Sequence, residues 1–415
     1  MLLKLQNTVK HYEWGSAEWI PAVTGQDNPQ KIPWAELWMG LHPEGPSQTV
    51  YRGEVLPLSR LINGNPRSFL GRTVQEKYGG LPFLFKLLAA EKPLSIQAHP
   101  NLSQAKEGWE REERAGIALN APERNYKDAN HKPEILCALG PFTGMCGFRE
   151  PSEIEERLEC FSSPAPANVR ETLQSLRSVL RGADGLRAFL TALFALDTPS
   201  RRLLCRYALA GAEVLGGKYP QYRDEWGLTA SFAGIYREDP AVIAPLYLNC
   251  INLEKGDAVY LPAGILHAYV KGFGVELMAN SDNVLRGGLT GKHIDVDELL
   301  KILLFKPFKP AILRLEPDTP FYTYPSEAEE FSLSVLRGGK NKITPDKDGP
   351  CIAVVTEGKA SLAVPETGEE LSLVRGESAF IGAERDTLSV SGDFCLYLAG
   401  TGDSGEGRRE HEDTC

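Results

Sequence analysis

The sequence predicts a mainly β protein into which an α-helical domain is inserted. Residues 1–148 and 245–400 consist of short apolar runs broken by Gly and Pro, which is typical of strands and tight turns. Residues 151–235 differ, because apolar side chains recur there at intervals of three and four residues, as on one face of a helix. A chain of 415 residues is also too long for one ordinary domain, so we expect two or three.

The helical segment begins near Pro151, where Ser152 can cap a helix. Its clearest apolar stripe is Val169, Leu173, Leu176 and Leu180, and a second stripe follows the GADG break at residues 182–185. Outside this segment, residues 101–120 are charged and interrupted by Gly, which indicates a surface helix followed by a loop. Residues 294–304 open with acids and predict one more short helix.

The predicted domains follow these changes in texture and the two prolines of LFKPFKP at residues 304–310. They are a discontinuous first β domain of residues 1–150 and 236–310, a helical domain of 151–235, a C-terminal β domain of 311–400 and a disordered tail of 401–415. The C-terminal domain contains an internal repeat, since GESAFIG at 376–382 parallels GDAVYLP at 256–262. Aligning the two copies places Thr387 where the first has His267, so we expect no metal ligands in the second.

Charge and composition exclude several classes of protein. There are 45 Lys and Arg against 55 Asp and Glu, a net charge of -10, which argues against binding to nucleic acid. The most apolar stretch, residues 81–90, is too short to span a bilayer, and the first residues lack the apolar core of a signal peptide. Eight cysteines without a CxxC pair indicate reduced thiols, so we expect a cytoplasmic protein without membrane partners.

A candidate metal site follows from the segment GDAVYLPAGILH at residues 256–267, which resembles the second conserved motif of cupins, small β-barrels that hold a metal. Cupins usually take further ligands from a His-x-His pair and a Glu, and this chain has no His-x-His. Strand alternation instead puts Gln97 and His99 on one face, and Glu134 stands at the entrance of an apolar strand. Gln97, His99, Glu134 and His267 offer the nitrogen and oxygen donors of a catalytic zinc site. Singly, each histidine has the alternative of an ordinary hydrogen-bonded residue, and Gln is an uncommon zinc ligand.

Five separated segments together resemble the type I phosphomannose isomerase (mannose-6-phosphate isomerase) family. They are YEWGS at 12–16, WMGLHPEGPS at 38–47, LPFLFKLLAAEKPLSIQAHPN at 81–101, YKDANHKPEILCAL at 126–139, and the stretch from GDAVYLPAGILH to LTGKH at 256–293. The resemblance implies a cupin enzyme that interconverts mannose 6-phosphate and fructose 6-phosphate, with a helical domain and a C-terminal cupin-like domain. It also implies one Zn²⁺ per chain, held by the four residues named above.

Such an isomerase moves a proton between C1 and C2 of the sugar through an enediol, with zinc as Lewis acid. Glu276, expected on the strand after His267, is a candidate base if burial raises its pKa, and the alternative is a structural ion pair with Arg286 or Lys271. The resemblance implies that Arg286 is catalytically important. Lys86, a single charge in an apolar run, is either inward in the pocket with a possible acid–base role or a gatekeeper on an edge strand.

The phosphate of the substrate is a dianion that calls for cations and hydroxyl groups around it. The predicted phosphate and sugar contacts are Ser95, Lys132, Arg286 and Lys292, of which the resemblance marks Lys292 as a substrate contact. Tyr269, expected on the same face as His267, is a further predicted substrate contact, and His42 is either a pocket wall or a turn stabiliser. We expect a small-molecule sugar phosphate as the partner and a monomeric enzyme.

Two other functions remain as alternatives. One is a non-catalytic sugar-binding metal cupin, which would not need a base such as Glu276. The other is a metal-dependent oxygenase, which favours iron held by two histidines and a carboxylate, without a fourth ligand such as Gln97. The sequence leaves the identity of the base open.

Overall fold

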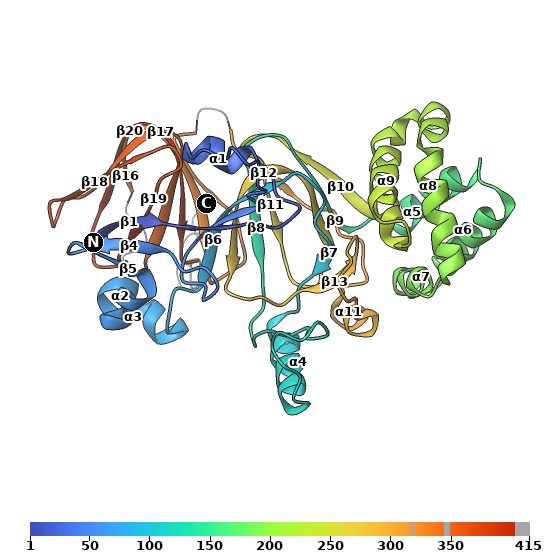
Figure 1. Ribbon diagram of the computed structural model, residues 1–415, viewed down its shortest axis with the longest axis horizontal. Coiled ribbons are helices and arrows are strands. Elements are labelled where there is room, and N and C mark those ends of the chain that lie inside the picture. The colour runs from blue at the N-terminus through green and yellow to red at the C-terminus, as the bar shows by residue number, and fades with distance from the viewer. Residues whose placement is uncertain (317–318, 344–348, 403–415) are drawn as a thin grey trace, which may run out of the picture.

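The structure is a computed structural model that describes residues 1–316, 319–343 and 349–402, with the backbone alone at 340–343. Within these ranges it is mainly β-sheet, with a group of helices at one end and a second sheet at the other (Figure 1). The predicted class, a mainly β protein with an inserted helical segment, is confirmed. The predicted disordered tail, residues 401–415, lies outside the described residues from residue 403 onward.

The first sheet holds eleven strands of the described chain, and β12 runs through its centre. Its strands are β2 (Thr8–Lys10), β3 (Glu36–Met39), β6 (Phe83–Ala90), β7 (Ile96–Ala98), β8 (Glu134–Ala138), β9 (Phe142–Phe148), β10 (Leu248–Leu253), β11 (Ala258–Leu261), β12 (His267–Ala279), β13 (Leu285–Gly288) and β14 (Ile312–Leu313).

Strand β12 joins two halves of this sheet. Its first residues pair with β7 and β9, whereas its second half pairs with β6 and β8. The register shifts between Tyr269 and Lys271, and Gly272 packs so closely that a Cβ atom there would lie 2.3 Å from the Phe142 ring. The expectation that Glu276 lies on a separate strand after His267 is therefore wrong, because the glycine bends one long strand instead of ending it.

The second sheet combines strands from both ends of the described chain. They are β1 (Leu2–Gln6), β4 (Gln48–Tyr51), β5 (Glu54–Pro57), β15 (Phe321–Tyr324), β16 (Ser332–Ile343), β17 (Cys351–Val364), β18 (Glu369–Val374), β19 (Ser378–Ile381) and β20 (Leu388–Gly400). Strand β1 pairs with β19 on one side and β4 on the other. Residues 1–150 thus contribute strands to both sheets. This long-range pairing leaves no local pattern in the sequence, and the predicted boundaries of the first domain stay a prediction.

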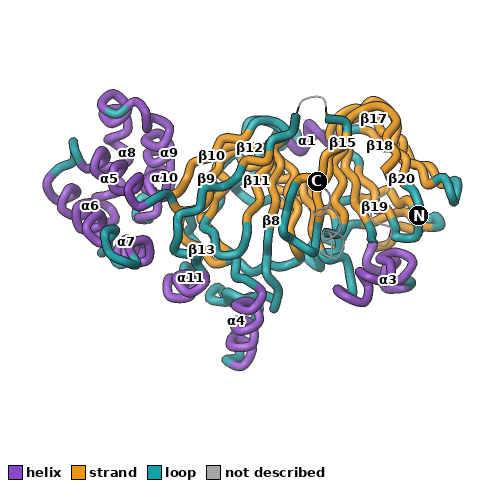
Figure 2. Tube along the Cα trace, turned by 180° about the vertical axis from the view of Figure 1, so that it is seen from behind, coloured by secondary structure: helices purple, strands orange, loops and turns teal. Residues whose placement is uncertain are grey.

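The helices of residues 151–235 form a block at the end of the molecule away from the second sheet, and α4 projects from the side of the first sheet (Figures 1 and 2). The helices are α1 (Trp19–Thr24), α2 (Leu58–Gly64), α3 (Pro66–Tyr78), α4 (Leu102–Arg114), α5 (Pro151–Ser162), α6 (Ala167–Val179), α7 (Gly185–Phe194), α8 (Thr198–Lys218), α9 (Arg223–Ile235), α10 (Ala244–Tyr247) and α11 (Val296–Ile302). Helices α5 to α9 occupy the segment predicted to be helical, whereas α2 and α3 replace expected strands.

Two apolar cores support the first sheet from opposite sides. One joins Leu158 and Trp226 of the helical block to Phe148 of β9 and Leu285 of β13. The other joins Phe85 of β6 to strands of the second sheet. The first sheet is therefore held between the helical block and the second sheet.

The internal repeat is visible in the backbone. Gly256 and Gly376 have φ angles of 92° and 84°, a left-handed conformation that favours glycine. Each lies two residues before a four-residue strand, β11 or β19. The repeated motif is thus a turn that leads into a strand, and Thr387 directly precedes β20 as His267 begins β12.

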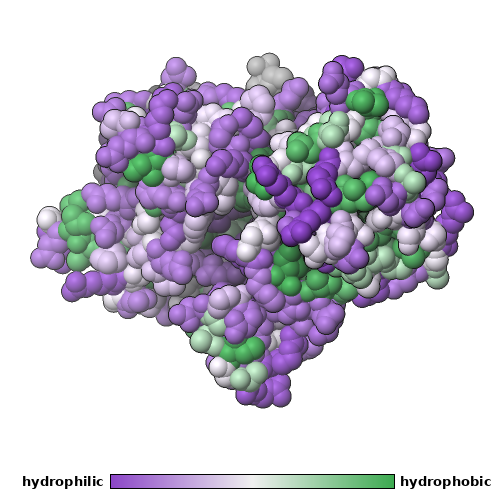
Figure 3. Space-filling model, turned by 45° about the vertical axis from the view of Figure 1, so that its right-hand side comes forward, coloured by the Kyte–Doolittle hydropathy of each residue, from purple (hydrophilic) through white to green (hydrophobic). Residues whose placement is uncertain are grey.

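In the described part of the chain, the helices are all too short or too polar to cross a membrane. Figure 3 shows hydrophobic residues in small separate groups among hydrophilic ones on the face that brings the helical end forward.

Candidate active site

Polar residues gather on one face of the first sheet because of strand alternation and register. In β6, Phe83, Phe85 and Leu87 pack toward the second sheet, so Lys86 points to the opposite face. Lys86 lies directly opposite Glu276 of β12 and Trp38 of β3. It therefore faces the interior from a central strand, which excludes the alternative of an edge-strand gatekeeper.

Lys86 and two carboxylates form a buried ion network. Its Nζ lies 2.8 Å from Glu276 Oε2 and 3.5 Å from Glu36 Oε1, and all three side chains are less than 9% exposed. Glu36 also accepts a 2.7 Å hydrogen bond from the indole N–H of Trp38. One ammonium group thus offsets the charge of two buried carboxylates.

This network sets the protonation of its members. Burial raises the pKa of Glu276, and the attraction of Lys86 offsets this only in part. Burial alone would lower the pKa of Lys86, but Glu276 and Glu36 together raise it above its ordinary value. Lys86 is therefore protonated in the resting site, and it can accept a proton only after it has donated one.

The partner of Glu276 differs from the one expected. Lys271 lies on the outer part of β12 and forms an exposed ion pair with Glu91 at 2.5 Å. Arg286 makes no ion pair among the described residues. The alternative that Glu276 pairs with Arg286 or Lys271 is therefore wrong, because alternation across the bend brings Lys86 opposite it.

Three predicted metal ligands meet beside this network. His99 directly follows β7, Glu134 begins β8 and His267 begins β12. Nε2 of His99 lies 3.4 Å from Glu134 Oε1, and Nε2 of His267 lies 3.4 Å from Glu134 Oε2. Their candidate donor atoms all lie within 4.8 Å of one another, and no side chain of the three is more than 2% exposed. We call these three residues the metal triad.

The other ring nitrogens orient both histidines. Nδ1 of His99 lies 2.7 Å from the carbonyl oxygen of Asn283, and Nδ1 of His267 lies 2.9 Å from that of Ile265. Because a carbonyl oxygen only accepts, each Nδ1 donates a proton and each Nε2 presents a lone pair. Both Nε2 atoms and Glu134 Oε2 lack a hydrogen-bond partner within the described ranges. A cation between them would satisfy all three, and two imidazoles with a carboxylate suit zinc.

The charge state of the metal triad also suits a divalent cation. Burial, together with the charge of Lys132, lowers the pKa of His99 to about 4. Burial alone would raise the pKa of Glu134, but Lys132, whose Nζ is 2.8 Å from Oε1, and the histidines hold it well below its usual range. Near neutral pH His99 and Glu134 therefore offer a neutral imidazole and a carboxylate, the forms that bind metal.

Gln97 and Lys132 flank the metal triad. Gln97 is half-buried and is the register partner of both His267 and Arg286, and its role as a fourth ligand stays a prediction. Lys132 contacts Glu134, as alternate residues on an extended segment can. Its contact with substrate also stays a prediction, with Glu134 as its partner in the structure.

Two cations, Arg286 and Lys292, lie on the segment that follows β12, which we call the cationic segment. Arg286 in β13 is half-buried, and burial lowers the pKa of its guanidinium. Lys292 lies on the loop after β13, where burial and the charge of Arg286 lower its pKa. Neither makes an ion pair with a carboxylate of the described chain. Neighbouring cations without a protein counter-ion attract an anionic ligand.

Tyr269 lies close to His267 and Glu276. The Tyr269 ring is 6.2 Å from that of His267, and its buried hydroxyl lies beside Glu276. That hydroxyl makes no hydrogen bond of normal length within the described residues. Ser95 is half-buried in the connection between β6 and β7.

His42 has both ring nitrogens engaged. Nε2 lies 3.0 Å from Oδ2 of Asp282, and Nδ1 accepts the backbone N–H of Glu44 at 3.2 Å. The ring also packs edge-on against Trp38, with 4.5 Å between centroids. This arrangement fits both alternatives, since His42 stabilises its own turn and forms a fixed wall.

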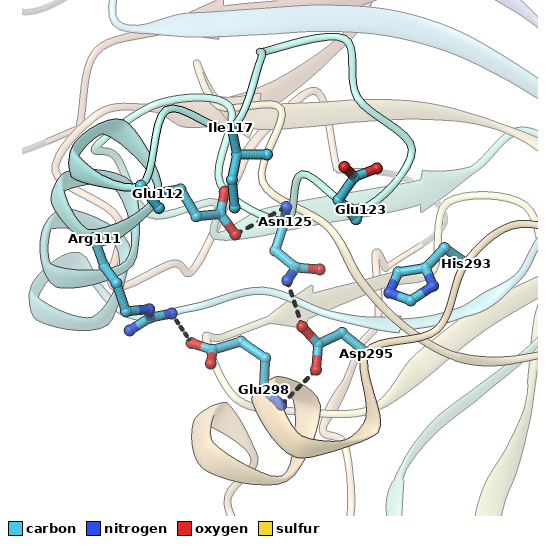
Figure 4. Close-up of a pocket in the computed structure, with 9 residues that line it drawn as sticks. Arg111, Glu112, Ile117, Glu123, Asn125, His293, Asp295 and Glu298 are labelled. Carbon is cyan, nitrogen blue, oxygen red and sulfur yellow. Dashed lines mark hydrogen bonds and ion pairs between the residues drawn. The ribbon is translucent and has the colours of Figure 1, made fainter.

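A pocket of about 360 Å³ opens between α4 and α11 (Figure 4). Its lining does not include the metal triad. Several polar groups around it hold its walls together, because Asp295 accepts from Asn125 at 2.8 Å and Glu298 accepts from Arg111 at 2.5 Å. His293, which follows Lys292, stands at its edge (Figure 4). The pocket thus borders the cationic segment and lies apart from the triad.

Sequence reasoning missed Glu36, Trp38 and Asn283. In AELWMG, alternation places Glu36 and Trp38 on one strand face, and an acid in an apolar run is the same signal that singled out Lys86. Asn283 stands in the SDN turn, where an Asn has an ordinary turn role as well.

The fold and the site define a class of protein: a metal-dependent enzyme in which two histidines and a carboxylate project from a bent β-sheet beside a buried acid–base network. The cupin enzyme predicted from the sequence is a member of this class.

Comparison with known proteins gives the particular family. Residues 2–151 match the family described as phosphomannose isomerase type I, catalytic domain. The mannose-6-phosphate isomerase of Escherichia coli (strain K12) is 36% identical over 403 residues, which cover 94% of this chain and 97% of that protein. Mannose-6-phosphate isomerase 2 of Arabidopsis thaliana is 34% identical over 431 residues, with 96% and 93% covered.

A solved structure agrees along nearly the whole chain. It is the mannose 6-phosphate isomerase of Salmonella typhimurium bound to its substrate and to zinc, with a TM-score of 0.87, 35% identity, and 97% of this chain and 100% of that chain covered. This chain belongs to the mannose-6-phosphate isomerase family. The resemblance and the cupin fold expected from sequence are confirmed, and the chain is an isomerase with a His–Glu–His metal site.

Proposed function

We propose that this enzyme interconverts D-mannose 6-phosphate and D-fructose 6-phosphate at one zinc ion held by His99, Glu134 and His267, with Gln97 as the fourth ligand. The observation that carries the proposal is the convergence of three buried donor atoms that lack hydrogen-bond partners in the described chain. Catalytic zinc commonly leaves a coordination position for substrate. Bound zinc supplies a Lewis acid that polarises the sugar oxygens at C1 and C2.

Glu276 is the proposed base. As a carboxylate it takes the proton from C2 of the aldose and returns it to C1, which converts the aldose to the ketose through the enediol. A base works best when its pKa lies near the operating pH, and burial raises the pKa of Glu276 in that direction. The buried hydroxyl of Tyr269 beside it is available to hydrogen-bond a sugar hydroxyl.

Lys86 is the proposed proton donor. Glu276 and Glu36 keep its ammonium protonated, and its Nζ lies 2.8 Å from Glu276. In this position it can pass a hydroxyl proton between O1 and O2 of the sugar while Glu276 moves the carbon-bound proton. The two groups therefore divide the proton transfers between them.

The cationic segment is proposed to bind the phosphate and to stabilise the negative charge that develops on the sugar during the reaction. Arg286 stabilises the charge of the enediolate, and Lys292 binds the phosphate with Ser95 and Lys132. The lack of a carboxylate partner for Arg286 and Lys292 within the described residues supports this assignment. His42 forms the wall of the site beside Trp38.

The working state of the enzyme is proposed to be a cytoplasmic monomer. The free thiols Cys137, Cys146 and Cys205 support a reducing compartment. Light scattering of the purified chain tests the monomer, and fractionation of cells that produce it tests the compartment.

A coupled assay for fructose 6-phosphate tests the function. We expect turnover of mannose 6-phosphate and its loss in His99→Ala. Binding of the sugar phosphate without turnover would instead support the non-catalytic sugar-binding cupin. Oxygen consumption with bound iron would support the oxygenase.

A further inference from the structure

Asn283 is fully buried, at 0% exposure, in the turn between β12 and β13. Its side-chain amide hydrogen-bonds to the backbone of the loop 127–130 through both its oxygen and its nitrogen. Oδ1 accepts the backbone N–H groups of Lys127 at 2.7 Å and Asp128 at 3.2 Å. Nδ2 donates to the backbone carbonyls of Asp128 and Asn130, both at 2.8 Å. One side chain thereby fixes the turn to the loop 127–130.

The backbone carbonyl of the same residue holds a metal ligand. It accepts the Nδ1–H of His99 at 2.7 Å. Glu134 and His267 are the first residues of strands, whereas His99 lies just beyond the end of β7, where its carbonyl accepts the N–H of Gly264 at 2.8 Å. That backbone bond does not set the angle of the His99 ring, which the hydrogen bond from Nδ1 to the Asn283 carbonyl fixes.

Neighbouring groups close the same unit. Ser281 Oγ donates to Asp128 Oδ1 at 2.9 Å, and the N–H of Asp282 donates to Asp128 Oδ2 at 2.8 Å. The loop 127–130 then continues to Glu134, at the start of β8. One buried turn thus helps to position two metal ligands, His99 and Glu134, which come from separate segments.

We propose that Asn283 is a positioning residue for the metal site. Its carbonyl fixes the Nδ1–H tautomer of His99, so that Nε2 faces Glu134 and His267, and its side chain holds that carbonyl in place. The inference rests on the proposed zinc site. Groups that orient metal-bound histidines in this way commonly change metal affinity about 10–100-fold when they are altered.

The amide chemistry of asparagine is required at this position. Only an amide accepts two N–H groups with one atom and donates to two carbonyls with the other. Asn283→Asp keeps the acceptor half but turns a carboxylate oxygen toward two carbonyl oxygens. Asn283→Ala removes both halves and leaves the backbone carbonyl without support.

Asn28 provides a matched control. Its side chain also bridges a loop, because Nδ2 donates to Ala17 at 2.9 Å and Ile32 at 2.8 Å, and Oδ1 accepts from Ile32 at 3.1 Å. None of its hydrogen bonds in the described chain reaches the metal triad. Asn28→Ala therefore measures what the loss of a loop-bridging amide does to stability alone.

The experiment measures zinc affinity of the full-length enzyme by competition with a chromophoric chelator, alongside Tm. We expect about 10–100-fold weaker zinc binding in Asn283→Ala and Asn283→Asp, and unchanged zinc binding in Asn28→Ala. Folded Asn283 variants that bind zinc within about threefold of the unaltered enzyme would overturn the inference. An equal loss in Asn28→Ala would overturn it as well.

A measurement on the unaltered chain keeps the test decisive if neither variant folds. The ¹⁵N shifts of the His99 ring in zinc-free enzyme should report the Nδ1–H tautomer, and the Nε2–H tautomer would refute the inference. If the unaltered enzyme and His99→Ala bind zinc equally, the proposed zinc site fails instead. The two failures are therefore distinguishable.

Discussion

Replacing Lys86 by methionine should destabilise the enzyme far more than the same change at Lys271. Lys86 is the only cation within ion-pair distance of Glu276 and Glu36 in the described chain, and all three side chains are buried. Methionine fills a similar volume but leaves two buried carboxylates uncompensated. Lys271 pairs with Glu91, but these side chains are 56% and 46% exposed.

The magnitude follows from the geometry. At an effective dielectric constant of about 20, unit charges at the two observed separations attract by roughly 6 and roughly 5 kcal/mol. Much of this attraction offsets the desolvation of the three groups, so the net loss on removing one partner of a buried pair is about 3–5 kcal/mol. An exposed pair such as Lys271–Glu91 contributes about 0–1 kcal/mol.

The loss should also depend on pH. A folded-state pKa raised above the unfolded value, as for Glu276, contributes stability that is present below the unfolded pKa and lost as pH rises through the folded pKa. Without Lys86 this elevation grows, because the attracting ammonium is gone. The penalty in Lys86→Met should therefore be largest near pH 7 and should shrink as pH falls toward about 4, the ordinary range of a carboxyl group.

Urea unfolding followed by tryptophan fluorescence measures both variants, and Trp38, with its ring 5.7 Å from the Lys86 ammonium, reports on the network itself. The reasoning is refuted if Lys86→Met costs no more than Lys271→Met at pH 7. It is equally refuted if the difference between them does not change with pH.

Further predictions concern catalysis. Glu276→Gln should lower kcat about 10²–10⁴-fold with little change in KM, and steady-state kinetics that show most of kcat retained would remove the base assignment. Because burial raises the pKa of Glu276, the unaltered enzyme should lose activity on acidification above the ordinary carboxyl range, and Glu276→Gln should lack that limb of its pH–rate profile. Lys292→Ala should raise KM for mannose 6-phosphate about 10-fold or more and lose discrimination against unphosphorylated mannose, and retained discrimination would contradict the phosphate contact.

Local patterns predicted the helical segment and the inward residues. The stripe of Val169, Leu173 and Leu176 is buried in the structure as the spacing indicates. The single charge of Lys86 in the apolar run FLFKLL gave an inward position as one of two alternatives, and the structure has Lys86 and Phe85 on different faces. Periods of 3.6 and 2 residues are properties of neighbours in the chain, so a single sequence carries them.

Long-range relations were beyond the same reasoning. Strand β1 pairs with β19 from the other end of the chain, and no local pattern encodes that choice. The predicted ion-pair partner of Glu276 was wrong for the same reason, because the register between β6 and β12 determines which residue lies opposite it. The continuity of β12 was missed because a glycine in a strand signals a turn and a bend alike.

The metal triad was predictable from the sequence in part: its residues could be named, but their meeting in space could not be derived. The residue types of His99, Glu134 and His267 and the resemblance to a known family named them, but spacing alone does not bring three segments together. Their Nε2 and carboxylate atoms meet because β7, β8 and β12 converge at one end of a bent sheet. The amide of Asn283 that orients His99 carries no signal in sequence beyond that of a turn.

The most direct test of the account is to remove and restore the metal of the full-length enzyme while measuring zinc content and fructose 6-phosphate formation on the same samples. We predict one zinc per chain, loss of turnover in proportion to the zinc removed, and recovery when zinc is returned. Undiminished turnover in a metal-free sample would contradict it.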